Sequence, residues 1–159
     1  MLPVNAKQVP PEIIGGKTLF ATTDGKFFNK NGRELKPLYN PNRPSRKSGG
    51  HANYMTMRHF GDKCCHVLIY ETFIGRRIPG MQIDHIDGNP LNNSADNLQL
   101  VTPAENIKRA KILRALRMAG RNPQDMSRKQ LLELFDKYEF LHTDPFERMD
   151  KEMKRHCEY

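Results

Sequence analysis

Asp84 and His85 stand side by side in the stretch IDHIDGNPLNNSADNLQLVTPAEN, residues 83–106, and their side chains suit metal-assisted hydrolysis. An aspartate carboxylate is a hard oxygen ligand of the kind that Mg²⁺ or Mn²⁺ prefers. A histidine titrates near neutral pH and can therefore take a proton from water. Because neighbouring strand residues point to opposite faces, the pair can serve one site only where a strand ends. We expect a strand to end at this pair.

Two asparagines further along the stretch extend the predicted site. Asn106 falls in the first turn of an expected helix, and a strand–strand–helix order returns that turn to the end of the first strand. Its carbonyl oxygen can then share a cation with Asp84, which leaves coordination positions open for water and phosphate oxygens. Asn97 opens a half-buried strand, where a buried amide can hydrogen-bond the preceding loop and hold His85 in place.

The other polar residues of the stretch are typical of turns. Asn89, Asn92 and Asn93 tolerate left-handed backbone conformations, and we assign them no chemistry. Asp87 beside Gly88 likewise favours a turn over a metal ligand. An isolated Asp-His pair is more often structural than catalytic, so a structural interpretation of the pair stays open.

The elements that must position these residues follow from the hydrophobic pattern. Residues 81–84 and 97–101 predict two short strands, and TPAEN predicts a helix that begins with a capping box and runs to about Ala119. Upstream, CCHVLIYETFIG predicts a short buried helix that ends at Gly75. We expect His66 in that helix to be structural or to contact phosphate, rather than to act in catalysis.

The flanking segments predict a β-rich module and a final helix. KTLFATT, DGKFFN and RELKPLY predict the strands of a small meander with turns at Asp-Gly and Asn-Gly, and ANYMTMRHF predicts a further strand. SRKQLLELFDKY predicts an amphipathic helix. We therefore divide the chain into a flexible N-terminal tail (1–16), a basic β-rich module (17–63), a core that contains the acidic stretch (64–120) and a C-terminal helical segment (121–159).

Basic residues lie on both sides of the acidic stretch. The chain has 26 basic and 18 acidic residues and a net charge of +8. Residues 25–63 are rich in lysine and arginine, as are residues 101–125, whereas residues 64–100 carry more acidic than basic side chains. Basic flanks favour a polyanion, and an acidic centre favours a divalent cation. The alternative to a polyanion-binding role is that these lysines and arginines form an ordinary solvated surface.

Composition excludes several other classes. Cys64 and Cys65 are adjacent and no CxxC pair exists, so we expect reduced thiols and no structural zinc. No apolar run approaches the roughly 20 residues that span a bilayer. We therefore expect no membrane association and a cytoplasmic protein. The 159 residues suit one compact domain with appendages.

The stretch DHIDGNPLNNSADNLQLVTPAEN resembles the HNH endonuclease motif of phage and intron-homing endonucleases, with its Asp-His pair, NN pair, DNL-type strand and TxxEN helix start. HVLIYETFIG is similar to the helix before that motif, and TTDGKFFNKNGRELKP to a strand-rich DNA-contacting module. The likeness covers residues 18–110. It implies an α+β fold with a ββα-metal (HNH, His-Me finger) core, a small β-rich module before it and C-terminal helices after it.

The resemblance also implies roles for individual residues. His85 matches the general base, Asp84 the metal ligand and Asn97 the asparagine that constrains the catalytic loop. Asn106 stands where the family name places a final histidine, so the motif reads H-N-N and a single Mg²⁺ or Mn²⁺ would lie between Asp84 and Asn106. The implied activity is metal-dependent DNA endonuclease activity, homing-like or phage-type, in a protein encoded by a bacterium or phage. The alternatives are a catalytically inactive DNA-binding protein on an HNH scaffold, or a nuclease directed at RNA.

The same resemblance makes DNA the expected partner, while the oligomeric state is left open. Basic side chains of the β-rich module and of the motif helix are expected to contact the phosphate backbone. They are Lys26, Lys30, Arg33, Lys36, Arg43, Arg46, Lys47, Lys108, Arg109, Lys111 and Arg114.

Overall fold

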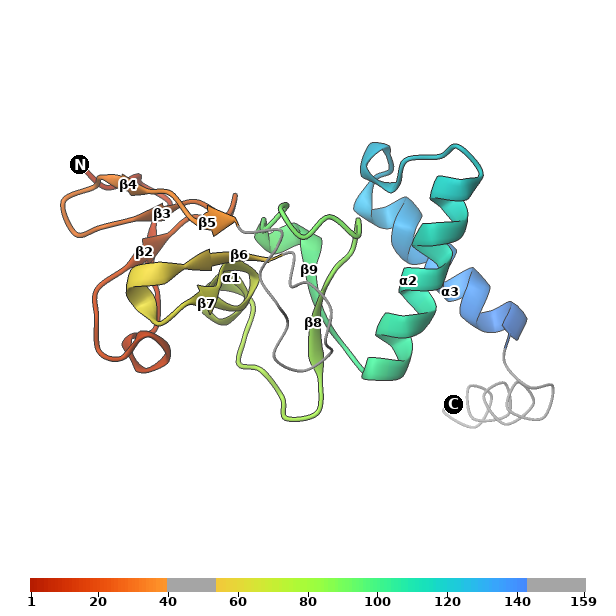
Figure 1. Cartoon of the computed structure of the whole chain (residues 1–159), viewed down its shortest axis with the longest axis horizontal. Coiled ribbons are helices and arrows are strands. Elements are labelled where there is room, and N and C mark those ends of the chain that lie inside the picture. The colour runs from red at the N-terminus through yellow and green to blue at the C-terminus, as the bar shows by residue number, and fades with distance from the viewer. Residues whose placement is uncertain (40–53, 143–159) are drawn as a thin grey trace, which may run out of the picture.

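The fold is described from a computed structural model, which covers residues 1–39 and 54–142. Figure 1 shows small antiparallel sheets at the N-terminal end, a two-stranded ribbon in the middle and two helices at the C-terminal end. Helices and small sheets thus occur together, as the expected α+β class requires. The predicted phosphate contacts Arg43, Arg46 and Lys47 lie outside the described residues.

The first sheet contains the predicted meander, but RELKPLY does not form the single strand that was expected: Glu34–Leu35 pairs here, whereas Leu38–Tyr39 joins a second sheet. Its four strands are antiparallel and follow one another in chain order. Two of the turns contain Gly25 and Gly32, whose φ values of 84° and 79° are left-handed and favour glycine. The strands are β1 (Lys7–Gln8), β2 (Phe20–Ala21), β3 (Phe27–Phe28) and β4 (Glu34–Leu35).

The N-terminal segment corrects one expectation, because residues 7–14 are not a flexible tail. Lys7 and Gln8 pair with β2, and a 3-10 helix, Pro11–Ile14, follows. Val9 and Ile14 are buried in the same core as Phe27. The prolines and glycines that suggested a tail instead shape a tight turn, which places two aliphatic side chains in the core.

The second sheet supports the predicted short helix. It consists of β5 (Leu38–Tyr39), β6 (Met55–Met57) and β7 (Lys63–Cys64), and α1 (Cys65–Phe73) packs against β6 and β7. The strand expected over residues 52–60 is shorter, because residues 58–60 form a 3-10 helix that ends at Gly61 in a left-handed conformation. Leu68 and Ile69 of α1 are fully buried and join both sheets to one core.

The ribbon and the following helix occur in the predicted order. β8 (Gln82–His85) pairs antiparallel with β9 (Leu98–Val101), and a 3-10 helix, Ala95–Asn97, lies between them. α2 (Pro103–Met118) begins with the expected capping box and contacts β8.

The last two elements cover α2. They are a 3-10 helix, Pro123–Asp125, and α3 (Arg128–His142). Leu131 and Phe135 of α3 are buried against Ile112 and Leu116 of α2, which forms a second, smaller core. Within the described ranges, no helix is long and apolar enough to cross a membrane.

Candidate active site

Asp84 and His85 occupy the end of β8, where the sequence analysis placed them. In the β8–β9 register Asp84 lies opposite Gln99 and His85 opposite Leu98. The Asp84 carboxylate accepts a hydrogen bond of 3.2 Å from Gln99 Nε2, and its Oδ2 lies 3.9 Å from Arg109 Nη1. His85 is 5% exposed and turns to the other face. The two side chains can therefore serve one site only at the strand end, as expected.

His85 is oriented by Asn93, to which the sequence analysis assigned no chemistry. His85 Nε2 lies 3.1 Å from Asn93 Oδ1. The Asn93 amide nitrogen donates to the Leu91 carbonyl oxygen and towards Met55 Sδ, which fixes Oδ1 as the atom that faces the ring. An oxygen acceptor at that distance requires the proton on Nε2, so Nδ1 carries the lone pair. A turn asparagine gave no local signal for this contact, because it depends on how the loop folds back over β8.

Two aromatic side chains from distant segments enclose His85. The His66 ring lies 5.2 Å from the His85 ring and edge-on to it, and the Tyr54 ring stacks at 6.2 Å. Burial lowers the pKa of His85, although the Asn93 hydrogen bond and the Asp84 carboxylate act in the opposite direction. Burial also lowers the pKa of His66 to about 3, with a further contribution from His85. Both rings are therefore neutral at physiological pH, the form that a general base requires.

Asn97 ties the loop to the strands, as expected. Its Oδ1 accepts from the Asp87 backbone N–H at 3.1 Å, and its Nδ2 donates to Asp87 Oδ1 and to the Asn92 carbonyl oxygen, each at 2.9 Å. The Ile86 backbone N–H also donates to the Asn97 carbonyl oxygen at 2.9 Å. Asn97 does not touch the His85 ring in any of these contacts. It holds the backbone on both sides of the loop, at the end of a 3-10 helix rather than as the first residue of a strand.

Asn106 lies on the same face of the ribbon as Asp84. Its Nδ2 donates to Gln82 Oε1 at 2.7 Å, and Gln82 is two residues before Asp84 on β8. Side chains two apart on a strand share a face. The return of α2 thus brings Asn106 and Asp84 to one side of β8, while His85 lies at the strand end.

The donor set on this face fits a hard divalent cation. Asp84 offers a carboxylate, and Asn106 donates through nitrogen to Gln82, which leaves its amide oxygen as the acceptor atom. Burial raises the pKa of Asp84, because its charge is partly desolvated there. Among the described residues no three His, Cys, Asp or Glu side chains gather to hold a metal. A carboxylate oxygen and an amide oxygen are donors of the kind that a hard divalent cation takes, with water and phosphate oxygens in the remaining positions.

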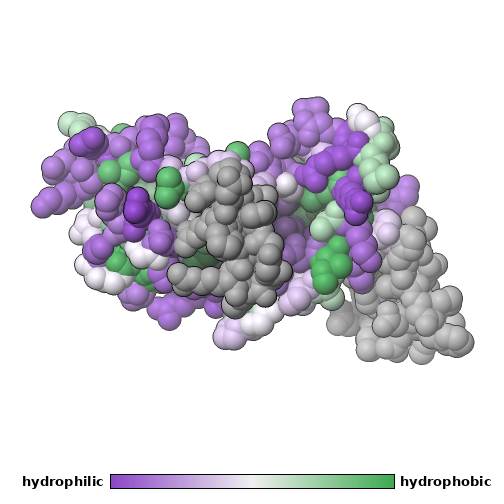
Figure 2. All heavy atoms as spheres, viewed as in Figure 1, coloured by the Kyte–Doolittle hydropathy of each residue, from purple (hydrophilic) through white to green (hydrophobic). Residues whose placement is uncertain are grey.

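The predicted phosphate contacts divide into exposed and enclosed side chains. Hydrophilic residues cover most of the face in Figure 2. Lys26 pairs with Asp24 at 2.8 Å and Lys36 with Glu34 at 2.5 Å, both at the surface. Arg33 and Lys36 line a hollow to which Arg58, not named from the sequence, also contributes.

On α2, the residues Lys108, Lys111 and Arg114 are exposed. Arg109 is different, because its side chain is only 17% exposed and lies beside Asp84.

Comparison with known proteins identifies the segment that carries this site. Residues 63–108 match the family model described as HNH endonuclease. This segment contains α1, β8, β9 and the first turns of α2, and with them Asp84, His85, Asn97 and Asn106. Residues 63–108 are thus similar to the HNH endonuclease family, which confirms the resemblance found in the sequence.

Individual relatives agree with this assignment. The chain is 51% identical over 41 residues to Protein 3.8 of Escherichia phage T7, which covers 26% of this chain and 34% of that protein. It is 49% identical over 45 residues, 28% of this chain and 26% of the other, to YosQ of Bacillus subtilis (strain 168), an SPbeta prophage-derived protein named provisionally as an HNH homing endonuclease. It is 40% identical over 58 residues, 36% of this chain and 31% of the other, to the uncharacterized HNH endonuclease L560 of Acanthamoeba polyphaga mimivirus.

The matched segment spans between about a quarter and a third of the length of each relative. No solved structure matches the chain.

Proposed function

We propose that this protein is a metal-dependent DNA endonuclease that hydrolyses phosphodiester bonds and leaves 5′-phosphate and 3′-hydroxyl ends. The observation that carries the proposal is the His85 ring, which is buried and neutral, with Nε2 fixed by Asn93 at 3.1 Å. Its Nδ1 is left to accept a proton from water. In phosphodiester hydrolysis such a base acts together with a positive charge that stabilises the leaving oxygen, and the neighbouring Asp84 is the proposed ligand of a cation that would supply it.

Asp84 and Asn106 would hold the divalent cation, and we assign β8, β9 and α2 to a ββα-metal core on this basis. The bound cation would supply Lewis-acid stabilisation of the charge that develops on the leaving 3′ oxygen. Asn97 keeps the loop between β8 and β9 closed, so that His85 and Asp84 keep their relative positions. Tyr54 and His66 exclude water from the side of His85 that faces α1.

DNA is the proposed substrate because exposed basic side chains flank the site on both sides in the sequence. Lys30 and Arg33 lie in the β-rich module, and Lys108, Lys111 and Arg114 on α2. Contacts of this kind give affinity with a steep dependence on salt and little sequence information. We propose that residues 17–63 act as the DNA-contacting module and residues 64–120 as the nuclease core. The relatives in a phage and a prophage support a phage-type or homing-like role.

A plasmid-nicking assay tests the proposal. Wild type with Mg²⁺ or Mn²⁺ should convert supercoiled plasmid to nicked or linear forms, and EDTA should abolish the conversion. His85→Ala should lower the rate by about 10²–10⁴-fold, the usual contribution of a general base. Asp136→Ala is the control, because Asp136 is an exposed residue of α3 outside the site and its removal should leave the rate unchanged.

Two results would count against the nuclease assignment. If wild type binds duplex DNA but nicks no plasmid with any divalent cation, the alternative of an inactive DNA-binding protein on the same scaffold is favoured. If His85→Ala cuts as well as wild type, the assignment of the base is wrong. The same assay on a single-stranded RNA of equal length distinguishes an RNA-directed nuclease.

A further inference from the structure

Arg109 is enclosed, unlike the other basic residues proposed to contact DNA. Its Nη1 lies 3.9 Å from Asp84 Oδ2, which is too long for a hydrogen bond. The same nitrogen is buried and has no hydrogen-bond partner. A buried donor without an acceptor costs free energy, and the cost is larger for a charged group. A buried, unpartnered guanidinium donor beside Asp84 therefore points to an acceptor that arrives with the substrate.

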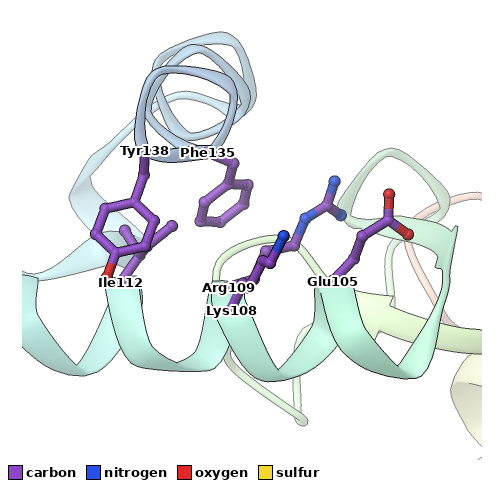
Figure 3. Close-up of a pocket in the computed structure, with 6 residues that line it drawn as sticks. All are labelled: Glu105, Lys108, Arg109, Ile112, Phe135 and Tyr138. Atoms are coloured by element: carbon purple, nitrogen blue, oxygen red, sulfur yellow. The ribbon is translucent and has the colours of Figure 1, made fainter. Parts of the chain in front are cut away.

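The C-terminal helix holds Arg109 in this position. The guanidinium carbon lies 5.1 Å from the centre of the Phe135 ring, and Phe135 is only 3% exposed. Figure 3 shows Phe135 descending from α3 towards Arg109 of α2, with Tyr138 next to Ile112 one turn further along. A cation over an aromatic face is attracted to the ring, and the contact also limits where the side chain can move. A helix outside the family match thus reaches the candidate active site.

We propose that Arg109 binds a non-bridging oxygen of the scissile phosphate, and that Phe135 of α3 positions it for this contact. The proposal rests on the nuclease function proposed above. The guanidinium offers planar, paired N–H donors, which match two phosphate oxygens better than an ammonium group does. It lies beside Asp84, whose carboxylate is at present its nearest opposite charge. When that carboxylate is committed to a divalent cation, the phosphate becomes the counter-charge of Arg109.

A purely structural ion pair between Arg109 and Asp84 makes different predictions. In that case, removal of Arg109 would lower the stability of the α2–α3 packing and would leave the cleavage step of the folded protein intact. If Arg109 binds the phosphate, by contrast, its removal lowers kcat in the folded protein and also lowers the affinity for DNA in the absence of metal. The two roles separate when stability, cleavage and metal-free binding are measured on the same variants.

The test compares wild type with Arg109→Ala, Arg109→Lys and Phe135→Leu. Arg121→Ala is the matched control, since Arg121 is an exposed arginine that follows α2 and lies outside the site. We expect Arg109→Ala to lower kcat on a defined duplex by roughly 10²–10³-fold, the usual loss for one preorganised donor to a developing anion. Arg109→Lys should recover part of this loss, because it keeps the charge but not the planar fork. Phe135→Leu should lower kcat and leave KM within about twofold of wild type, as expected for a positioning residue.

A second readout needs no cleavage. Duplex binding in EDTA, measured by fluorescence anisotropy across a salt series, should show a salt slope lower by about one unit for Arg109→Ala, which is the loss of a single phosphate contact. The Arg121→Ala slope should equal that of wild type. Thermal unfolding of each variant identifies any that do not fold, and Arg109→Lys then decides in place of Arg109→Ala.

Several outcomes would overturn the proposal. The proposal is wrong if the kcat of Arg109→Ala lies within about threefold of wild type. It is also wrong if the salt slope of duplex binding by Arg109→Ala in EDTA equals that of wild type. Arg109→Lys and Phe135→Leu with wild-type kcat overturn it even if the alanine variant is unfolded. If wild type and Arg109→Ala both cut fully while His85→Ala is inactive, the proposal for Arg109 is refuted and the nuclease function stands. A wild type that never cuts refutes the nuclease function as well.

Discussion

The contrast between Asn97 and Asn106 gives the sharpest prediction, because two asparagines of one motif have different physical tasks. Asn97 is 8% exposed and makes three side-chain hydrogen bonds, one of them to the carboxylate of Asp87. Asn106 is partly exposed and makes one, to Gln82. We expect Asn97→Ala to destabilise the fold and Asn106→Ala to leave it nearly unchanged.

The magnitude follows from the contacts. Two neutral hydrogen bonds are worth about 1 kcal/mol each and the bond to a carboxylate about 1.5–3 kcal/mol. Asn97→Ala should therefore lower the free energy of unfolding by about 4 kcal/mol, a large share of the roughly 5–15 kcal/mol of a typical domain. Asn106→Ala should change it by no more than about 0.5 kcal/mol, as is usual for surface substitutions.

The assay is urea unfolding at pH 7, followed by circular dichroism, with plasmid nicking measured on the same preparations. Both variants should lose nicking, Asn97→Ala because its loop opens and Asn106→Ala because a proposed metal ligand is gone. The reasoning is refuted if Asn97→Ala loses less than about 1 kcal/mol, since three buried hydrogen bonds would then contribute almost nothing. It is also refuted if Asn106→Ala is destabilised as strongly as Asn97→Ala.

Four further predictions concern acid stability, the metal, the DNA and the base. The pKa of His66 is about 3 in the folded protein and 6.5 as its ordinary value, so the unfolded chain takes up a proton first as pH falls below about 6.5. The contribution of His66 to the free energy of unfolding should therefore be full above that pH and decline below it by up to about 1.4 kcal/mol per pH unit. The urea midpoint of His66→Gln should fall less steeply than that of wild type between pH 7 and pH 4. Equal pH dependence of the two midpoints would contradict this. EDTA or Asp84→Ala should lower cleavage by at least about 10²-fold with little change in duplex affinity, measured by anisotropy. Lys30→Ala and Lys111→Ala should each lower the salt slope of duplex binding by about one unit, and unchanged slopes would remove them from the interface. Asn93→Ala should lower kcat about tenfold or more with KM nearly unchanged, because the His85 ring loses the partner that fixes its tautomer; a normal kcat would show that the contact is dispensable.

Local signals in the sequence were sufficient for the elements around the site. Thr102 and Glu105 predicted the start of α2, and both reciprocal hydrogen bonds of the capping box are present. The turn dipeptides at Gly25 and Gly32 predicted the meander, because few other residues adopt positive φ there without strain. Such features depend on residues a few positions apart, and they can therefore be read from one chain.

Contacts between distant segments were not predictable in the same way. Residues 1–16 carry the signals of a tail, yet Val9 is fully buried, because burial depends on the surface that the meander offers to it. Asn93 was indistinguishable from the other turn asparagines until the loop placed its oxygen 3.1 Å from His85 Nε2. Arg109 was one of several basic residues of a helix until α3 covered it.

The sequence alone therefore determined the residue types and spacing on which the proposed chemistry rests, which are those of Asp84, His85, Asn97 and Asn106 on a strand–strand–helix unit. Only the tertiary structure decided how that chemistry is tuned. It removed water from His85 through Tyr54 and His66, and it placed Arg109 between Asp84 and Phe135. The physical reason is that hydrogen-bond donors and ligands are properties of residue types, whereas desolvation and charge pairing are properties of neighbours that lie far apart along the chain.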